Sequence, residues 1–191
     1  MYTQNNPAAR AANCVTPRQL QVMNTLRRLW MEHVFWTRAF IVSTAFSNAD
    51  ISNVTNRLLR NPADFAAVLT PFYGAQAARA FENLFTAHLQ IAAQLVNAAK
   101  AGDSAAAEQA RQQWYANAAG IAAFLARANP YWNQADWQAM LFEHLRITEN
   151  EAVQQLNGRY ADSIAQYDAI QNQALEMADV MAQGVIRQFR L

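Results

Sequence analysis

Glycine and proline are scarce in this chain, whose 191 residues include five of each. The glycines stand singly, at positions 74, 102, 120, 158 and 184. No glycine-rich loop can therefore cradle a phosphate, and the sequence carries no kinase or nucleotide-binding signature. Because alanine is abundant and runs of β-branched residues are short, helix propensity is high over nearly the whole length and no strand is predicted.

Cysteine is nearly absent, since Cys14 is the only one. A single thiol excludes an intrachain disulfide and a thiolate cluster that would hold a metal or an iron–sulfur centre. Cys14 falls in a polar leader, residues 1–15, which lacks the charged start and apolar core of a signal peptide. The longest apolar stretch, residues 34–46, is too short to span a bilayer and contains Arg38. We expect a cytoplasmic protein that has no membrane partner.

An excess of charge of one sign is also missing, because 15 basic and 14 acidic residues give a formal net charge of +1. The basic residues form no stripe, and Lys100 is the only lysine, so nothing provides the electrostatic footprint of a nucleic-acid partner. The chain also contains no Gly-x-Ser-x-Gly elbow and no two inward carboxylates for acid–base catalysis. These absences predict a non-catalytic protein that does not bind nucleic acid.

Apolar residues, in contrast, make up 53% of the chain, which is enough for one domain with a substantial core. Thr16, Pro17 and Gln19 form a capping box with proline at the first helical position, which predicts a long helix to about residue 47. Gly102 and Asp103 are suited to end one helix and start the next. They predict a tight turn between two long helices, 75–101 and 104–127.

The remaining signals predict short helices and a fourth long one. Short helices are expected over residues 50–60 and 61–69, with a break at 71–74, and another over 133–147. Thr148 and Glu151 form a second capping box, which predicts a last helix to the C-terminus, with an interruption left open at Asn157 and Gly158. The predicted fold is all-α, an up-and-down four-helix bundle with additional short helices, in a single domain over residues 16–191.

The three histidines of the chain, His33, His88 and His144, each fall near the middle of the apolar stripe of a different predicted helix. His33 and His88 lie near the midpoints of two long helices, so antiparallel packing would bring them to a similar depth. Asn117 and Gln171 are the polar exceptions on the inner faces of two other helices, near the same level. The sequence therefore predicts a polar layer at mid-bundle, with Thr37 and Tyr167 close by.

Two interpretations of this layer stay open. As a binding site, His33, His88 and His144 suit Zn or Cu, and His33 with His88 could ligate a haem, with Asn117 and Gln171 as further contacts to a cofactor. As structure, the same histidines would hydrogen-bond to neighbouring polar side chains in the core. The Glu-x-x-His pairs of ferritin-like dimetal sites are absent from the sequence.

Two charged residues raise similar questions. Arg38 lies in the most apolar part of the first helix and needs a carboxylate partner if it is buried. The candidates are Asp50, Asp64 and Glu82. Glu151 would lie two turns from His144 on a continuous helix, although a capping role explains it more simply.

Two function hypotheses follow. The first is a non-catalytic bundle that binds a metal ion or a small ligand or cofactor through the mid-bundle polar layer. The second is a structural or assembly module with no bound cofactor, which meets a protein partner or a second copy of itself through an aromatic and apolar surface.

Five segments also carry a family resemblance: LWMEHVFWTR, RLLRNPADFAAVLTPFYG, AAQLVNAAKAGD, NPYWNQADWQAMLFEHL and ALEMADVM. Over about residues 25–189 the chain resembles a family of small helical bacterial proteins of unknown function. Some members of that family carry an acetylglutamate kinase label. The resemblance implies a helical fold and transfers no active-site pattern to this chain.

Overall fold

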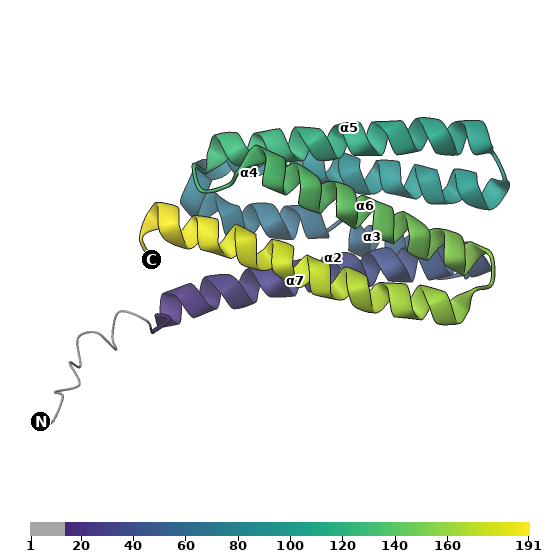
Figure 1. Ribbon diagram of the computed structural model, residues 1–191, viewed down its shortest axis with the longest axis horizontal. Coiled ribbons are helices and arrows are strands. Elements are labelled where there is room, and N and C mark those ends of the chain that lie inside the picture. Colours follow the sequence, from purple (N-terminus) through teal and green to yellow (C-terminus); the bar gives the residue numbers. More distant parts are fainter. Residues whose placement is uncertain (1–13) are drawn as a thin grey trace, which may run out of the picture.

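The computed structural model describes residues 14–191, whose regular structure is entirely helical (Figure 1). The helices are α2 (Pro17–Phe46), α3 (Ile51–Leu58), α4 (Asn61–Ala101), α5 (Ser104–Ala128), α6 (Gln134–Leu156) and α7 (Tyr160–Phe189). The predicted all-α class is thus confirmed. The predicted polar leader lies, up to residue 13, outside the described residues. Among residues 14–191, no helix is both long enough and apolar enough to cross a membrane.

Three of the predicted helix boundaries are confirmed in atomic detail. The Thr16 side chain accepts from the backbone amide of Gln19, whose own side chain bonds back to the amide of Thr16. Gly102 ends α4 in the left-handed conformation, and the Asp103 carboxylate accepts from the first turn of α5. Asn133 caps α6 in the same way. Local side-chain chemistry is sufficient to define these ends.

The break expected at residues 71–74 is a reversal of the chain within α4. Gly74 adopts φ 79° and ψ 163°, a conformation that is essentially confined to glycine. The ring centroids of Phe65 and Phe85, twenty residues apart in sequence, are 5.3 Å apart. A straight helix would separate them by about 30 Å. Residues 61–73 therefore fold back onto residues 75–101.

One predicted boundary is wrong. Thr148 and Glu151 do not cap a helix, because both are buried within α6, which continues to Leu156. The chain turns instead at Asn157 and Gly158, and Gly158 has a positive φ of 73°. As a result α6 is itself a long helix, and the predicted count of four long helices is not confirmed.

Five helices of 23 or more residues form a closed ring in the described part of the chain. In order around the ring they are α2, α7, α6, α5 and α4, and α4 packs in turn on α2. Figure 1 shows α6 crossing the front between α5 and α7. The core fills the interior of this ring. The short helix α3 lies against α2 and α4, where Val54 and Leu58 cover Phe40 and Ile41 in a smaller apolar cluster.

Candidate functional site

The three histidines do converge in the interior, but in two groups. His33 on α2 and His144 on α6 are buried neighbours, with ring centroids 5.7 Å apart. His88 on α4 is also buried, and the ring of Phe85 stands between it and His33, 4.9 Å from one and 6.0 Å from the other. The predicted polar layer therefore exists as a histidine pair and a third histidine across an aromatic ring.

Both ring nitrogens of His88 are engaged. The indole Nε1 of Trp114, which can only donate, bonds to His88 Nε2 at 3.1 Å. His88 Nδ1 must then carry the proton, and it donates to Asn117 Oδ1 at 2.9 Å. Asn117 is thus confirmed as a member of the layer. A metal ion or haem iron could reach His88 only if Trp114 or Asn117 gave up its hydrogen bond.

His144 is held by an amide in the same manner. Its Nδ1 bonds to Gln173 Oε1 at 2.8 Å, and Gln173 Nε2 donates to the carbonyl of Met140 at 2.7 Å. Gln173, and not the predicted Gln171, therefore lies against His144. Gln171 is half-buried on α7 next to Tyr167.

The amide contacts repeat with one pattern. Asn117 and Gln173 each donate to the carbonyl four residues before the histidine that they hold, at Leu84 and Met140. Asn61 likewise donates to the carbonyl of Leu29, four residues before His33. The Asn61 side chain also acts on the pKa of His33, although His33 Nδ1 and Asn61 Oδ1 have no partner within hydrogen-bonding geometry.

This pattern is visible in the sequence as a regular spacing, which hydrophobic periodicity does not reveal. Each histidine precedes its amide residue by a nearly constant interval, 28 residues for Asn61 and 29 for both Asn117 and Gln173. Such a spacing corresponds to a helix, a turn and a return along the next packed segment.

Burial keeps all three imidazoles neutral. It lowers the pKa of His88 to about 3, and the hydrogen bond to Asn117 opposes this only in part. The pKa of His33 is well below its usual value, first through burial and then through the proximity of the other two histidines. Burial also lowers the pKa of His144, against the effect of Gln173. The layer is thus uncharged at neutral pH.

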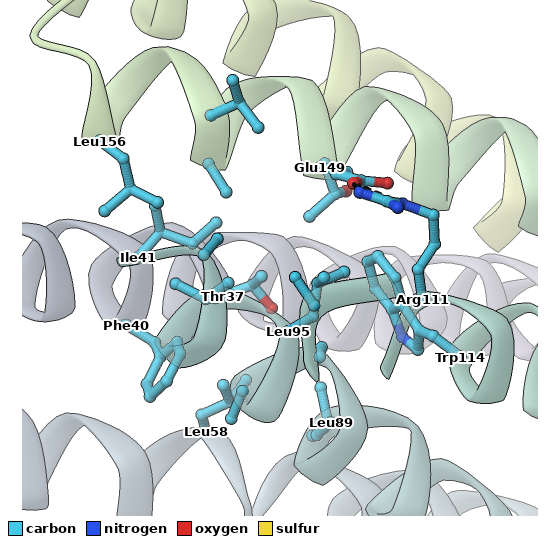
Figure 2. Close-up of a pocket in the computed structure, with 18 residues that line it drawn as sticks. Thr37, Phe40, Ile41, Leu58, Leu89, Leu95, Arg111, Trp114, Glu149 and Leu156 are labelled. Carbon is cyan, nitrogen blue, oxygen red and sulfur yellow. Dashed lines mark hydrogen bonds and ion pairs between the residues drawn. The ribbon is translucent and has the colours of Figure 1, made fainter. Parts of the chain in front are cut away.

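Beside this layer lies an apolar cavity (Figure 2). It is bounded by α2, α3, α4, α5 and α6, has a volume of about 70 Å³ and is partly open to solvent. One water needs about 10–15 Å³ on this measure, so the cavity is several times larger than a single water site. Trp114 joins the two features, because it lines the cavity and donates to His88.

The cavity has few polar groups. Arg111 on α5 and Glu149 on α6 form an ion pair at one side of it, and Arg111 also bonds to Glu108. Thr37 and Thr148 contribute hydroxyl groups, and each follows a layer histidine, His33 or His144, by four residues. The cavity therefore begins about one helical turn from the histidine pair.

Arg38 is paired with a carboxylate, as expected, but not with any of the predicted candidates. Arg38 Nη1 on α2 donates to Glu151 Oε1 on α6 at 2.5 Å and also reaches the carbonyl and the hydroxyl of Ser163 on α7. The ring of Tyr167 lies 4.9 Å from the guanidinium carbon. Burial raises the pKa of Glu151 to about 7, although the charge of Arg38 acts in the opposite direction.

This geometry corrects the predicted partners of Arg38, which were Asp50, Asp64 and Glu82. The partner is Glu151, 113 residues away. Asp64 pairs with Arg60 within its own segment instead. On a continuous α6, Glu151 is seven residues after His144 and so shares its inward face.

Comparisons with known proteins add no identity. No family model, no curated protein and no solved structure matches the chain. The resemblance to a bacterial family therefore stays a prediction. Among residues 14–191, no three His, Cys, Asp or Glu side chains are placed to hold one metal ion. The proposed Zn, Cu and haem ligands also stay predictions.

Proposed function

We propose that this protein binds a small apolar ligand, without catalysis, in the cavity between α2, α3, α4, α5 and α6. The observation that carries the proposal is the cavity itself, about 70 Å³ in volume and lined by side chains that are mostly apolar. Close-packed interiors contain few voids larger than a water molecule. A space of this size beside a fully hydrogen-bonded His88 is more consistent with a ligand than with core packing alone.

An entry route supports the same proposal. A surface groove between α3 and α4 shares four residues with the wall of the cavity: Phe40, Leu58, Leu89 and Ala93. These four side chains line both the groove and the cavity. The eight-residue helix α3 follows a turn in which Ser47 has a positive φ of 55°. In this proposal the ligand enters beside α3, from this groove. We place this binding function in the cytoplasm.

The histidine layer has a positioning role in this proposal. Its side chains are neutral and His88 is bonded on both nitrogens. Through Trp114, this network fixes one wall of the cavity. Rigid walls favour one ligand shape over others because the site need not be ordered on binding.

Binding of 1,6-diphenyl-1,3,5-hexatriene tests the proposal, since this neutral hydrocarbon fluoresces strongly only in apolar surroundings. We expect saturable binding with one molecule per chain. Ala92→Leu should weaken it by roughly 50-fold, because the added carbons remove room for about three ligand carbons at about 0.8 kcal/mol each. Ala92 lines the cavity on α4.

The matched control is Ala116→Leu, because Ala116 is an exposed alanine in the middle of α5. It should leave the dissociation constant unchanged. Absence of saturable binding to the wild type, or equal affinity in the two variants, would refute a ligand site in this cavity.

A second candidate function has its own observation. Phe46, Tyr160 and Ile164 are large apolar residues with exposed fractions of 53%, 47% and 57%. The rings of Phe46 and Tyr160 are in contact, 5.6 Å apart, where α2 ends and α7 begins. An exposed apolar cluster of this kind favours the assembly module, with a second copy of the chain as the partner.

A further inference from the structure

Two threonines in the cavity wall, Thr37 and Thr148, differ from Thr55 and Thr70 in the hydrogen bonding of their hydroxyl groups. Within helices, a threonine hydroxyl commonly donates to the carbonyl four residues earlier. Thr55 and Thr70 do this, at 2.7 Å and 2.8 Å. The hydroxyls of Thr37 and Thr148 are buried and have no hydrogen-bond partner among the described residues. Both belong to residues that line the cavity.

The position of these hydroxyls defines a polar end of the cavity. Thr148 is only 5% exposed, so its oxygen cannot turn to bulk water. In Figure 2 the Thr37 oxygen is directed towards the space between the helices. An unmatched buried hydroxyl costs about 1–3 kcal/mol, which a ligand with one polar terminus would recover.

The charges near this end argue against an ionic ligand. His33 and His144, one turn away, are uncharged at neutral pH and cannot neutralise an anion or attract a cation. Arg111 is already bonded to two carboxylates, those of Glu149 and Glu108. An anionic head group would therefore be buried without a free counter-charge, and a cationic one would have to compete with Arg111 for Glu149.

The shape of the cavity favours a chain over a compact molecule. Its wall runs from Leu89 to Ala99 along α4 and from Thr148 to Leu156 along α6. These stretches correspond to about 15 Å and about 12 Å at the rise of an α-helix. Small alanines line much of this length, which leaves a slender apolar path.

We infer, on the premise that the proposed function holds, that the ligand is a neutral amphiphile: an alkyl chain with a terminal hydroxyl or carbonyl group that bonds to Thr37 and Thr148. The chain occupies the apolar path towards Leu156. The polar terminus lies next to the histidine pair.

Displacement of bound diphenylhexatriene by three compounds of equal chain length tests this assignment. They are 1-octanol, octanoate and octylamine, measured at pH 7 with the wild type and with Thr148→Val. We expect 1-octanol to bind most tightly. The valine, which matches threonine in shape, should weaken 1-octanol by about 3- to 10-fold, as the loss of one neutral hydrogen bond predicts. It should leave diphenylhexatriene binding unchanged, which also shows that the variant is folded.

Two further variants sharpen the result. Thr148→Ser keeps the hydroxyl and should retain wild-type affinity for 1-octanol. Thr44→Val removes another buried hydroxyl that lacks a partner but does not line the cavity, and it should change neither ligand. The neutral-amphiphile assignment would be overturned if octanoate or octylamine bound more tightly than 1-octanol. It would also be overturned if Thr148→Val left the affinity for 1-octanol unchanged. In both cases the site for the hydrocarbon would stand. Failure of diphenylhexatriene to bind the wild type would instead remove the site itself.

Discussion

At the scale of single residues, the histidine layer depends on amide side chains from neighbouring segments. Asn117 and Gln173 each fix two things at once, since each bonds to an imidazole and donates to a backbone carbonyl, as Asn117 does for His88 and Leu84. This arrangement selects the neutral Nδ1-protonated tautomer. The consequence is a core that tolerates buried imidazoles at neutral pH and is destabilised by acid.

The acid sensitivity can be measured at His88. Its pKa falls from 6.5 to about 3 on folding, so the unfolded chain binds more protons between these values. Stability from His88 is therefore complete above pH 6.5 and decreases as the pH falls. The loss reaches about 2 kcal/mol at pH 5. Urea unfolding measures the free energy of unfolding at pH 7 and at pH 5. The decrease between the two pH values should be smaller in His88→Gln than in the wild type, by about 2 kcal/mol.

Comparison with the variant is needed because Glu151 acts in the opposite direction. Burial raises its pKa to about 7, so its contribution is favourable below pH 4.5 and is lost as the pH rises towards 7. This effect is present in both proteins and cancels in the difference. An identical pH dependence in wild type and His88→Gln would contradict the protonation state assigned to His88.

At the scale of elements, the helix ends with a purely local cause were predictable and those decided by packing were not. Thr16 and Asp103 cap helices whatever surrounds them. Thr148 and Glu151 match a capping box equally well, but the fold buries both in the middle of α6. A hydroxyl and a carboxylate three residues apart cannot reveal by themselves whether the chain around them faces water or the core.

In the candidate site, too, some features were predictable from local sequence and others depended on packing. The inward direction of His33, His88 and His144 followed from the apolar stripes on which they lie. The choice of Gln173 over Gln171 did not, because the two point about 160° apart on α7 and only the position of α6 distinguishes them. The cavity was not predictable, since its volume depends on how five helices pack.

The contact between α7 and the segment before α6 gives a prediction at this scale. Gly184 on α7 is buried against Trp132, and a Cβ built there would lie 1.8 Å from the indole nitrogen. Gly184→Ala should therefore lower the free energy of unfolding by about 3 kcal/mol through overpacking. Urea denaturation measures this change.

Gly120 in α5 is the matched control, because a Cβ there would have no atom within 4 Å. Gly120→Ala should raise the free energy of unfolding by roughly 0.5–1 kcal/mol, since alanine favours the helix. The two substitutions are chemically identical and are expected to have opposite signs. If Gly184→Ala were also stabilising, α7 could not pack on Trp132 as described.

At the scale of the whole molecule, the assembly hypothesis is tested by the mass in solution. The cluster of Phe46, Tyr160 and Ile164 would be covered in a dimer. Light scattering over a range of concentrations should then show a dimer for the wild type and a monomer for Ile164→Asp, because the introduced carboxylate would be buried. The control is Val15→Asp, a change at an apolar residue of similar exposure that precedes α2. A wild-type monomer at every concentration would contradict self-assembly through this surface.

The closure of the helix ring has a consequence for how the chain folds. Its first and last helices are adjacent: Arg27 pairs with Asp179, and the Gln19 side chain donates to the carbonyl of Leu191. Most helical proteins fold rapidly because their contacts are local, but this ring closes through partners more than 150 residues apart. During synthesis α2 must wait until α7 has left the ribosome. Until α7 arrives, the interior stays open on one side, and that interval is when the nascent protein is most exposed to aggregation and proteolysis.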